Sequence, residues 1–401
     1  MAVTLGKGTK YNPKTKTGWK REGGKWVYYN QGKKQQHSNI LGKVTKNVKK
    51  GLSDVLKIGQ STDTYSKEKG RNLTVFEKRR QDLILDKTIK LNTDFALHPR
   101  LKNFYNLWKK NLGAIVHATN IPYTDRSHFD GQNLMESGGH IPYSVKTGWL
   151  GRGMKLAKLK GDGLALALPM PLLLRGIKSN DNYYPAKKSL PKSDIIDVLR
   201  SVYKDKSEHE LAEMMEIIYQ RSMIKMSSSS SRNNSSLAFK AGQELKKING
   251  PRVAVFEVGG FDTHAAQGGI DGSHSDSLIE MDDIFLNLEK GLGKEMNNTL
   301  IVTLTEFGRT VKQNSGLGTE HGYGSAIFMG GGILKKSQVY TDWPGLKKKD
   351  LFESRDLNST IDARSVYASA MSIVFDIDFL HAAYHLSQSC SNLLSDFFPN
   401  L

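Results

Sequence analysis

The sequence is short of cysteine, of long hydrophobic runs and of acidic residues. It contains one cysteine, Cys390, which excludes an intrachain disulfide and a metal site built from several thiolates. The longest apolar run, at 164–174, is too short to cross a bilayer and is interrupted by two prolines. The first residues form no apolar segment of the kind that directs export. We therefore expect a protein without a signal peptide or transmembrane segment, located in the cytoplasm, or in a virion if it is encoded by a phage.

Acidic residues are outnumbered by basic ones, and the imbalance lies at one end of the chain. The 401 residues include 58 Lys or Arg and 40 Asp or Glu, which gives a formal net charge of +18. Residues 1–70 hold 16 of the basic and 4 of the acidic residues, so this segment accounts for +12 of the total. An arm of this charge suits an anionic partner: nucleic acid, an acidic protein face or a membrane surface. The alternative is a solvated tail that keeps the protein soluble.

The arm also contains a cluster of aromatic residues. A Gly-Gly pair at 23–24 predicts a hairpin turn between two short strands. Aromatic rings between lysines can stack on bases or hold the arm in the groove of a protein. With little apolar content, the arm is expected to be irregular and extended, and to become ordered on a partner. The residues expected to bind such a partner are Trp19, Lys20, Arg21, Lys25, Trp26 and Tyr28.

Residues 71–401 have the patterning of one α/β domain. Short apolar stretches predict buried strands at 114–118, 253–258 and 300–304, and a further stretch at 327–329 ends in three glycines. Apolar residues recur at helical spacing over 275–292, and also around 101–108 and 238–248. The order of strand, helix, strand and glycine-rich turn is typical of a βαβ unit, so we expect a parallel sheet.

Polar motifs follow the second and third of these strands. GGFDTHAAQGG contains Asp262 and His264, TEFGRT contains Glu306 and Arg309, and GTEHGYG contains His321. Two carboxylates and two imidazoles are suitable ligands for a divalent metal ion, and an arginine can bind two oxygens of a phosphate or sulfate. Each residue also has an ordinary structural explanation, such as a turn-capping aspartate, a Glu–Arg pair or a loop histidine. The three motifs together favour a site.

The motifs, in their order along the chain, resemble the family known as domain of unknown function 1501 and, through it, the alkaline phosphatase and sulfatase-like superfamily. The matching segments are GGFDTHAAQ, LTEFGRT, EHGYGSAIFMGGG and VYTDWPGL, preceded by FALHPRLKNFYNLW, IVHATNIPYTDRSHFDGQNLMESGG and TGWLGR. The resemblance covers about 94–401. It implies a doubly wound, mostly parallel sheet flanked by helices, and a divalent ion (Zn, Ca, Mg or Mn) that activates a hydroxyl nucleophile for attack on phosphorus or sulfur.

The resemblance also implies a set of metal ligands. Asp262 and His264 resemble the first ligand pair, Glu306 takes the position of an Asp-His pair, and His321 takes that of a late histidine. A first strand that carries a further aspartate ligand in the family is not found in this sequence. Either the sheet lacks that strand, or another segment or another chain supplies it.

The loop TDRSHFDGQ takes the position of the superfamily's nucleophile. This makes Ser127 the candidate nucleophile, with His128 beside it as a ligand or base. Arg309 or Arg126 would stabilise the charge that builds on the equatorial oxygens. The alternative for Ser127 is a loop cap.

Three hypotheses about function follow from these features. The first is a metal-dependent phosphate or sulfate ester hydrolase with a reduced site. The second is a catalytically inactive structural or assembly protein, for example a phage virion component, that forms homo-oligomers or binds a protein through its basic arm. The third is nucleic-acid binding through the arm, which predicts a steep dependence of affinity on salt.

Overall fold

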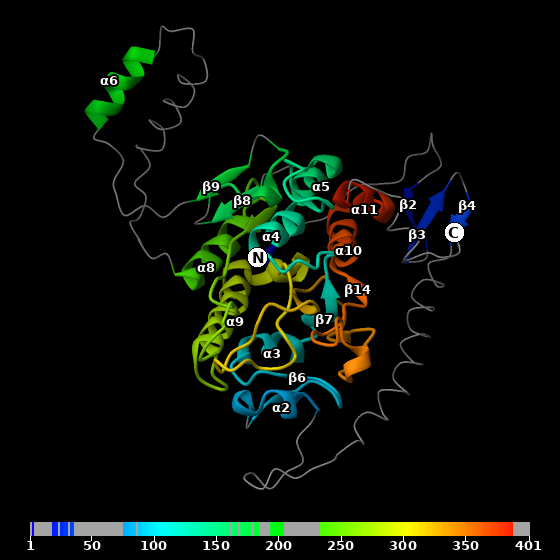
Figure 1. Cartoon of the computed structure of the whole chain (residues 1–401). Helices are drawn as coiled ribbons and strands as arrows, with labels where there is room; N and C mark the ends of the chain where they lie inside the picture. The colour runs from blue at the N-terminus through cyan, green and yellow to red at the C-terminus, as the bar shows by residue number, and fades with distance from the viewer. Residues whose placement is uncertain are drawn as a thin grey trace. The chain divides into compact units, whose positions relative to one another are not determined.

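The chain is described from a computed structural model, and Figure 1 shows its elements in order. Two compact units are present, one formed by Met1–Tyr183 with Asn234–Leu401 and the other by Tyr184–Asn233. In the second unit the structure describes one helix, α6 (Ser193–Tyr203). Cys390 lies outside the described residues. The structure describes residues 2–3, 18–22, 25–30, 33–35, 75–85, 87–159, 163–166, 169–177, 180–183, 193–203 and 233–387.

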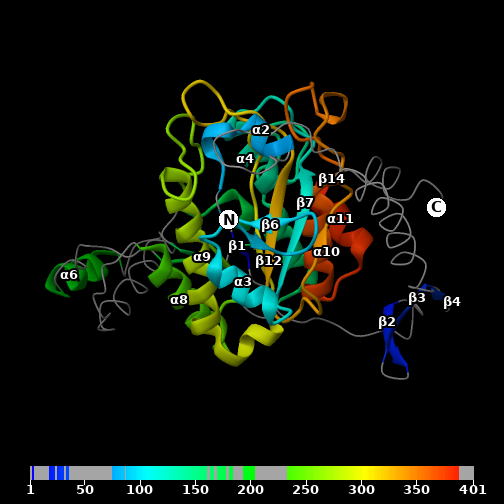
Figure 2. The ribbon, with the colours of Figure 1, turned by 90° about the horizontal axis from the view of Figure 1, so that it is seen from below.

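A six-stranded sheet lies between the helices of the larger unit, as Figure 2 shows. Its hydrogen-bonded order begins with β1, continues through β11, β12 and β7, and ends with β13, while β14 also pairs with β7. β13 and β14 run parallel to β7, and the other three pairs are antiparallel. The strands are β1 (Ala2–Val3), β7 (Gly113–Asn120), β11 (Ile301–Thr303), β12 (Ser325–Gly330), β13 (Val339–Tyr340) and β14 (Ile361–Asp362).

The prediction of a doubly wound, mostly parallel sheet is wrong for this sheet. A parallel connection must carry the chain back to the starting end of the sheet, usually through a helix. Residues 304–324, which join β11 to β12, contain no helix. The chain therefore turns at the end of β11 and returns antiparallel beside it. The loop formed in this way carries two of the three polar motifs.

Parallel strands also form a second, three-stranded sheet, in which β10 pairs with β8 and not with β11 as the predicted βαβ unit requires. Its order is β10–β8–β9, and both pairs are parallel. A further pair, β5 with β6, is antiparallel. The strands are β5 (Ile89–Lys90), β6 (Ala96–Leu97), β8 (Gly163–Leu166), β9 (Asp181–Tyr183) and β10 (Val253–Val255).

The basic arm contains strands. β2 (Gly18–Glu22), β3 (Lys25–Asn30) and β4 (Lys33–Gln35) form an antiparallel sheet, with Trp19 opposite Tyr28. The pairing of β2 with β3 agrees with the predicted hairpin, whose two glycines lie outside the described residues. Apart from β1, the other residues of the predicted arm, up to residue 70, lie outside the described residues. β1, from the same segment, lies at the edge of the six-stranded sheet beside β11.

Helices cover both faces of the six-stranded sheet. Along β7, Ile115 packs with α3, α8 and α9, whereas Ala114 and Val116 pack with α4, α5, α10 and α11. This alternation follows from the period-two geometry of a strand, and it makes the unit a mixed α/β structure. The helices are α3 (Lys102–Lys109), α4 (His128–Ser137), α5 (Trp149–Ala157), α8 (Asn234–Leu245), α9 (Ser273–Leu292), α10 (Ala363–Phe375) and α11 (Phe379–Ser387).

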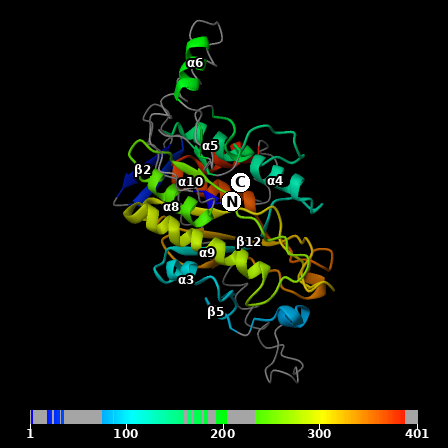
Figure 3. The ribbon, with the colours of Figure 1, turned by 90° about the vertical axis from the view of Figure 1, so that its left-hand side faces the viewer.

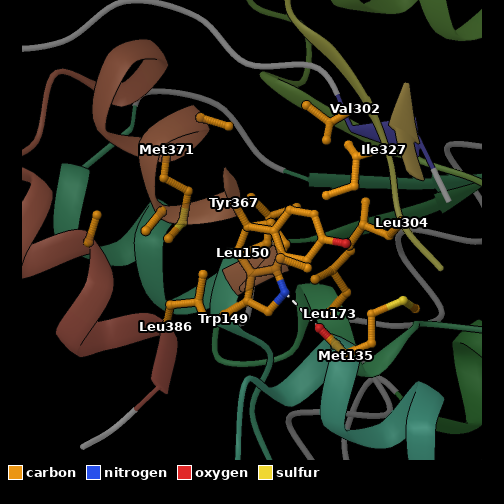
Figure 4. Packing of buried hydrophobic residues seen from close by; sticks show 14 of the residues in the cluster. Met135, Trp149, Leu150, Leu173, Val302, Leu304, Ile327, Tyr367, Met371 and Leu386 are labelled. Carbon is orange, nitrogen blue, oxygen red and sulfur yellow. Dashed lines mark hydrogen bonds between the residues drawn. The ribbon is translucent and has the colours of Figure 1, made fainter. Parts of the chain in front are cut away.

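Two contacts show how tightly these layers pack. The rings of Trp149 and Tyr367 stack with centroids 5.3 Å apart, and Trp149 Nε1 donates a hydrogen bond of 2.9 Å to the carbonyl of Met135 (Figure 4). On the other face, α8 lies along α9 (Figure 3), where a methyl group added to Gly242 would lie 2.8 Å from the Cα of Gly291.

Short helical turns complete the described residues: α2 (Val75–Arg79), η2 (Gln81–Leu83), η3 (Leu172–Leu174), η4 (Gly293–Asn298) and η5 (Lys348–Asp350). Within the described ranges, none of the helices combines the length and the apolar composition that crossing a membrane requires.

Candidate metal centre

Three loops at one end of the strands bring the predicted site residues together. His128 is the first residue of α4, a short distance beyond the end of β7. Asp262 and His264 follow β10, and Glu306 and His321 lie in the loop from β11 to β12. The site thus combines residues that are far apart in the sequence.

The carboxylate of Asp262 is the meeting point of three imidazole rings. His264 Nε2 and His321 Nε2 lie 2.8 Å and 3.0 Å from its Oδ1. His128 Nε2 lies 3.2 Å from its Oδ2. The Nε2 atoms of His264 and His321 are themselves 3.0 Å apart. Three ring nitrogens and one carboxylate therefore converge on a small volume.

The outer nitrogen of each ring, Nδ1, faces an oxygen that only accepts hydrogen bonds. The three contacts are His128 Nδ1 to Glu306 Oε1 at 2.6 Å, His264 Nδ1 to Glu320 Oε2 at 2.8 Å, and His321 Nδ1 to the Arg126 carbonyl at 2.8 Å. Because carboxylate and carbonyl oxygens have no proton to give, each Nδ1 is the donor. With Nδ1 as the donor, Nε2 is the nitrogen through which each ring could bind a metal ion at the centre of the site.

This arrangement fits a divalent cation. The Nε2 atoms of His264 and His321, 3.0 Å apart, are placed so that one ion could take both as ligands. The Nε2 of His128 is buried and has no hydrogen-bond partner, since its contact with Asp262 lacks hydrogen-bond geometry. Ligand atoms of His128, Asp262 and His321 all lie within 4.8 Å of one another. An outer nitrogen held by a carboxylate or carbonyl is the usual support of a metal-binding histidine.

Arg309 sets the charge of the central carboxylate. Its guanidinium donates to Asp262 Oδ1 and to the carbonyl of Thr319, and its Nε donates to Thr319 Oγ1 at 3.1 Å. Burial acts to raise the pKa of Asp262, but the hydrogen bond and charge of Arg309, with His321 and His264, outweigh it and lower that pKa to about 2. Asp262 is therefore ionised at neutral pH, as a metal ligand must be.

Glu306 lies behind His128 instead of beside Asp262. Its carboxylate contacts His128 Nδ1, and its side chain is 14% exposed. Glu320 takes the corresponding place behind His264. The motif GTEHGYG contains this residue, but Glu320 is not among the predicted site residues. An acidic residue directly before a histidine, in a loop with several glycines, is the pattern that could have identified it.

Ser127 and Arg126 precede His128. Ser127 occupies the N-cap position of α4, yet its side chain makes no capping hydrogen bond. Arg126 has a positive φ of 59° and pairs with Asp356 at 2.8 Å and with Glu353. The guanidinium of Arg126 is therefore engaged by two carboxylates, and its carbonyl by His321.

A cavity of about 1410 Å³ adjoins the metal centre. His128, Asp262, Glu306 and Arg309 line it, and Ser127 is not among its lining residues. Pockets for small molecules usually measure about 300–1,000 Å³. The cavity is thus larger than a phosphate or sulfate group alone requires, which leaves space for the rest of an ester.

A sequence model of the family described as "Protein of unknown function (DUF1501)" matches residues 90–377, which is more than half of the chain. No curated protein and no solved structure matches the chain. The match includes every residue of the candidate metal centre and leaves residues 1–89 outside it.

Proposed function

This chain is a member of the DUF1501 family, and from its site we propose that it is a metal-dependent hydrolase of phosphate or sulfate esters, similar to the alkaline phosphatases and sulfatases. The observation that carries the proposal is the convergence of three Nε2 atoms on Asp262 while each Nδ1 is held by an acceptor. Such a site is arranged for a cation, and the large adjoining cavity accommodates a substrate.

His128, His264, His321 and Asp262 would hold the metal ion. Three nitrogen ligands favour Zn²⁺ over Ca²⁺, Mg²⁺ and Mn²⁺, which suit oxygen ligands. When bound, the ion would polarise an oxygen of the ester as a Lewis acid. Glu306 contributes by fixing the ring of His128.

The remaining residues suggest how the ester would be attacked. The attacking group would be either a water molecule or Ser127, which lies directly before His128 and has no capping hydrogen bond. Glu306 lines the cavity, and only its Oε1 is bound to His128, so we assign Glu306 the role of general base. Arg309, fixed by Thr319, would stabilise negative charge on the ester oxygens.

Metal content tests the proposal directly. We expect the purified chain to contain about one divalent ion per molecule by elemental mass spectrometry, and we expect His321→Ala and His128→Ala to lose it. His381→Ala, which removes an exposed histidine on α11, is the matched control and should retain the ion.

Hydrolysis of 4-nitrophenyl phosphate and 4-nitrophenyl sulfate should then follow the metal content across the four proteins. Metal bound equally in wild type and His321→Ala would contradict the assigned ligands. A wild-type chain that binds no ion after incubation with Zn²⁺ and Mn²⁺ would remove the basis of the proposed hydrolase.

The strands of the basic arm support a second candidate function, which is partner binding. The register of β2 and β3 pairs Trp19 with Tyr28 and Arg21 with Trp26. Aromatic and basic residues are thus grouped in one small sheet. We propose that this sheet binds either a protein in an assembly or a nucleic acid, while residues 71–401 carry the proposed hydrolase site.

A further inference from the structure

One wall of the cavity is built by residues that precede the family match. This segment, residues 75–85, is called the strap below, and it comprises α2, Arg80, η2 and the two residues that follow. Phe76, Arg80 and Leu85 are among the strap residues that line the cavity with His128 and Asp262. The family match begins at residue 90, so the strap adds a wall that the matched domain does not contain.

Arg80 is anchored, but its charge is not neutralised. Its Nε donates to the carbonyl of Val311 at 3.1 Å, and its Nη2 donates to the carbonyl of Thr310 at 2.6 Å. Its guanidinium carbon lies 4.6 Å from the ring centroid of Phe76. Within the described ranges, Arg80 forms no ion pair with a carboxylate, and its Nη1 makes no hydrogen bond. A guanidinium held by neutral groups only, at the wall of a cavity, is suited to an anionic ligand.

The surroundings of Arg80 are positive. Burial lowers the pKa of Arg80 to about 10, and the nearby charge of Arg309 acts in the same direction. Arg80 is therefore still protonated at neutral pH, close to a second guanidinium. Arg309 is already paired with Asp262, so Arg80 is the guanidinium here that an anionic ligand would neutralise.

His274 adds a third group to this part of the cavity. It lies in the first turn of α9 and lines the same cavity, and its Nδ1 is buried without a hydrogen-bond partner. Burial lowers the pKa of His274 to about 4, and the charges of Arg80, His98 and Arg309 lower it further in the same sense. The ring is neutral at pH 7 and lines the cavity close to Arg80.

We propose that Arg80, in the part of the cavity that His274 also lines, binds a second anionic group of the substrate. The inference rests on the proposed function, since it takes the reacting ester to lie at the metal centre. The preferred substrates would be phosphate or sulfate esters whose alcohol part carries a carboxylate or a further phosphate. The cavity volume of about 1410 Å³ leaves room for both groups. The strap would thus determine which esters the chain accepts.

The test compares probes that have one or two acidic groups. Isothermal titration calorimetry of the full chain, as purified and after chelation of metals, would use methylphosphonate, phosphonoacetate and methylenediphosphonate. We expect at least one probe with two acids to bind about tenfold more tightly than methylphosphonate, the gain typical of a hydrogen bond between charged groups. The probe with the larger gain identifies carboxylate or phosphate as the second acid, and either result supports the proposal.

Variants assign the preference to Arg80. Arg80→Met should remove the preference for probes with two acidic groups. Arg79→Met, which changes a neighbouring arginine that does not line the cavity, should retain that preference. Gln313→Ala loosens the attachment of the strap at Asp82 without changing any charge, and should also retain it. Arg80→Lys keeps the charge but loses the planar fork, so a smaller preference should remain even if Arg80→Met fails to fold.

The outcomes separate the two proposals. Equal binding of one-acid and two-acid probes by the wild type, or a preference that survives in Arg80→Met, overturns the subsite. A preference that is present in a chain that hydrolyses no ester supports the subsite while contradicting the proposed hydrolase. Hydrolysis of simple esters without any preference contradicts the subsite alone.

Discussion

The histidines of this chain differ in what their ring nitrogens face. In the metal centre, the outer nitrogens face acceptors, and the inner nitrogens face Asp262. His117, on β7, is the opposite case, because its Nδ1 accepts a hydrogen bond of 2.7 Å from the N–H of Ala118. Its ring lies against Phe95 and Trp343, with centroids 5.6 Å and 5.1 Å away. Burial lowers the pKa of His117 to about 4, so this ring is neutral in the folded chain.

The buried His117 predicts a loss of stability in acid. Its folded pKa lies below the ordinary value of 6.5, so between about pH 6.5 and pH 4 the unfolded chain binds the proton more readily. The free energy of unfolding should therefore be fully retained above pH 6.5 and should fall by on the order of 2 kcal/mol as the pH approaches 4.5. Denaturant titrations at these two pH values should show a smaller difference for His117→Gln than for wild type. His381→Gln, at an exposed position, should behave as wild type, and an equal difference in all three proteins would contradict the assignment.

At the scale of elements, the metal centre depends on how closely α4 approaches the loop after β11. Gly131 is buried on α4, and a methyl group added there would lie 3.0 Å from Glu306 Cβ and 3.3 Å from the ring of Tyr123. The same helix begins with His128, which Glu306 holds. The absence of a side chain at Gly131 therefore sets the distance between the first residue of a helix and a carboxylate from another loop.

Gly131→Ala should separate helix stability from site geometry. In an ordinary helix interior, alanine is more favourable than glycine by about 1 kcal/mol. Here the added methyl must move α4 or Glu306 by a few tenths of an ångström, which loosens the support of His128. We expect metal affinity to fall by about 10–100-fold, as when the support of a metal-binding histidine is lost, with a small change in the unfolding midpoint.

Competition with a chromophoric chelator measures this affinity. Gly259→Ala is the control, since a methyl group there meets nothing within 4 Å and should leave metal binding unchanged. Wild-type affinity in Gly131→Ala would show that close packing at this glycine does not position Glu306.

At the scale of the whole molecule, charge and candidate chemistry are separated along the chain. Residues 1–70 carry +12 of the net +18, whereas the candidate metal centre lies between His128 and His321. Long-range attraction of an anionic partner would therefore come mainly from the arm.

A chain that lacks residues 5–70 tests the arm and keeps β1 beside β11. We expect the full chain to bind a short single-stranded oligonucleotide with an affinity that falls steeply as salt rises, because each neutralised phosphate releases counterions. The shortened chain should bind far more weakly at every salt concentration, as measured by fluorescence anisotropy. Salt-insensitive binding, or equal binding by both chains, would contradict the nucleic-acid assignment. A larger mass in solution for the full chain alone would indicate protein assembly instead.

The sequence by itself determined the local features of this protein. Short apolar stretches predicted β7, β10, β11 and β12, and helical spacing of apolar residues predicted α9, because these patterns depend on residues close together in the chain. The motifs with Asp262, His264 and His321 marked the site for the same reason. Membership of the family also followed from contiguous segments.

Only the tertiary structure decided the rest, because it depends on distances between residues far apart in the sequence. β12 returns antiparallel to β11 because the loop between them contains no helix. The spacing of apolar residues does not predict the path of that loop. The contact of His128 with Glu306 joins residues 178 positions apart, and that of Arg80 with Thr310 joins residues 230 positions apart. Packing brings these groups together, and so determines which side chains face the metal centre and which support it.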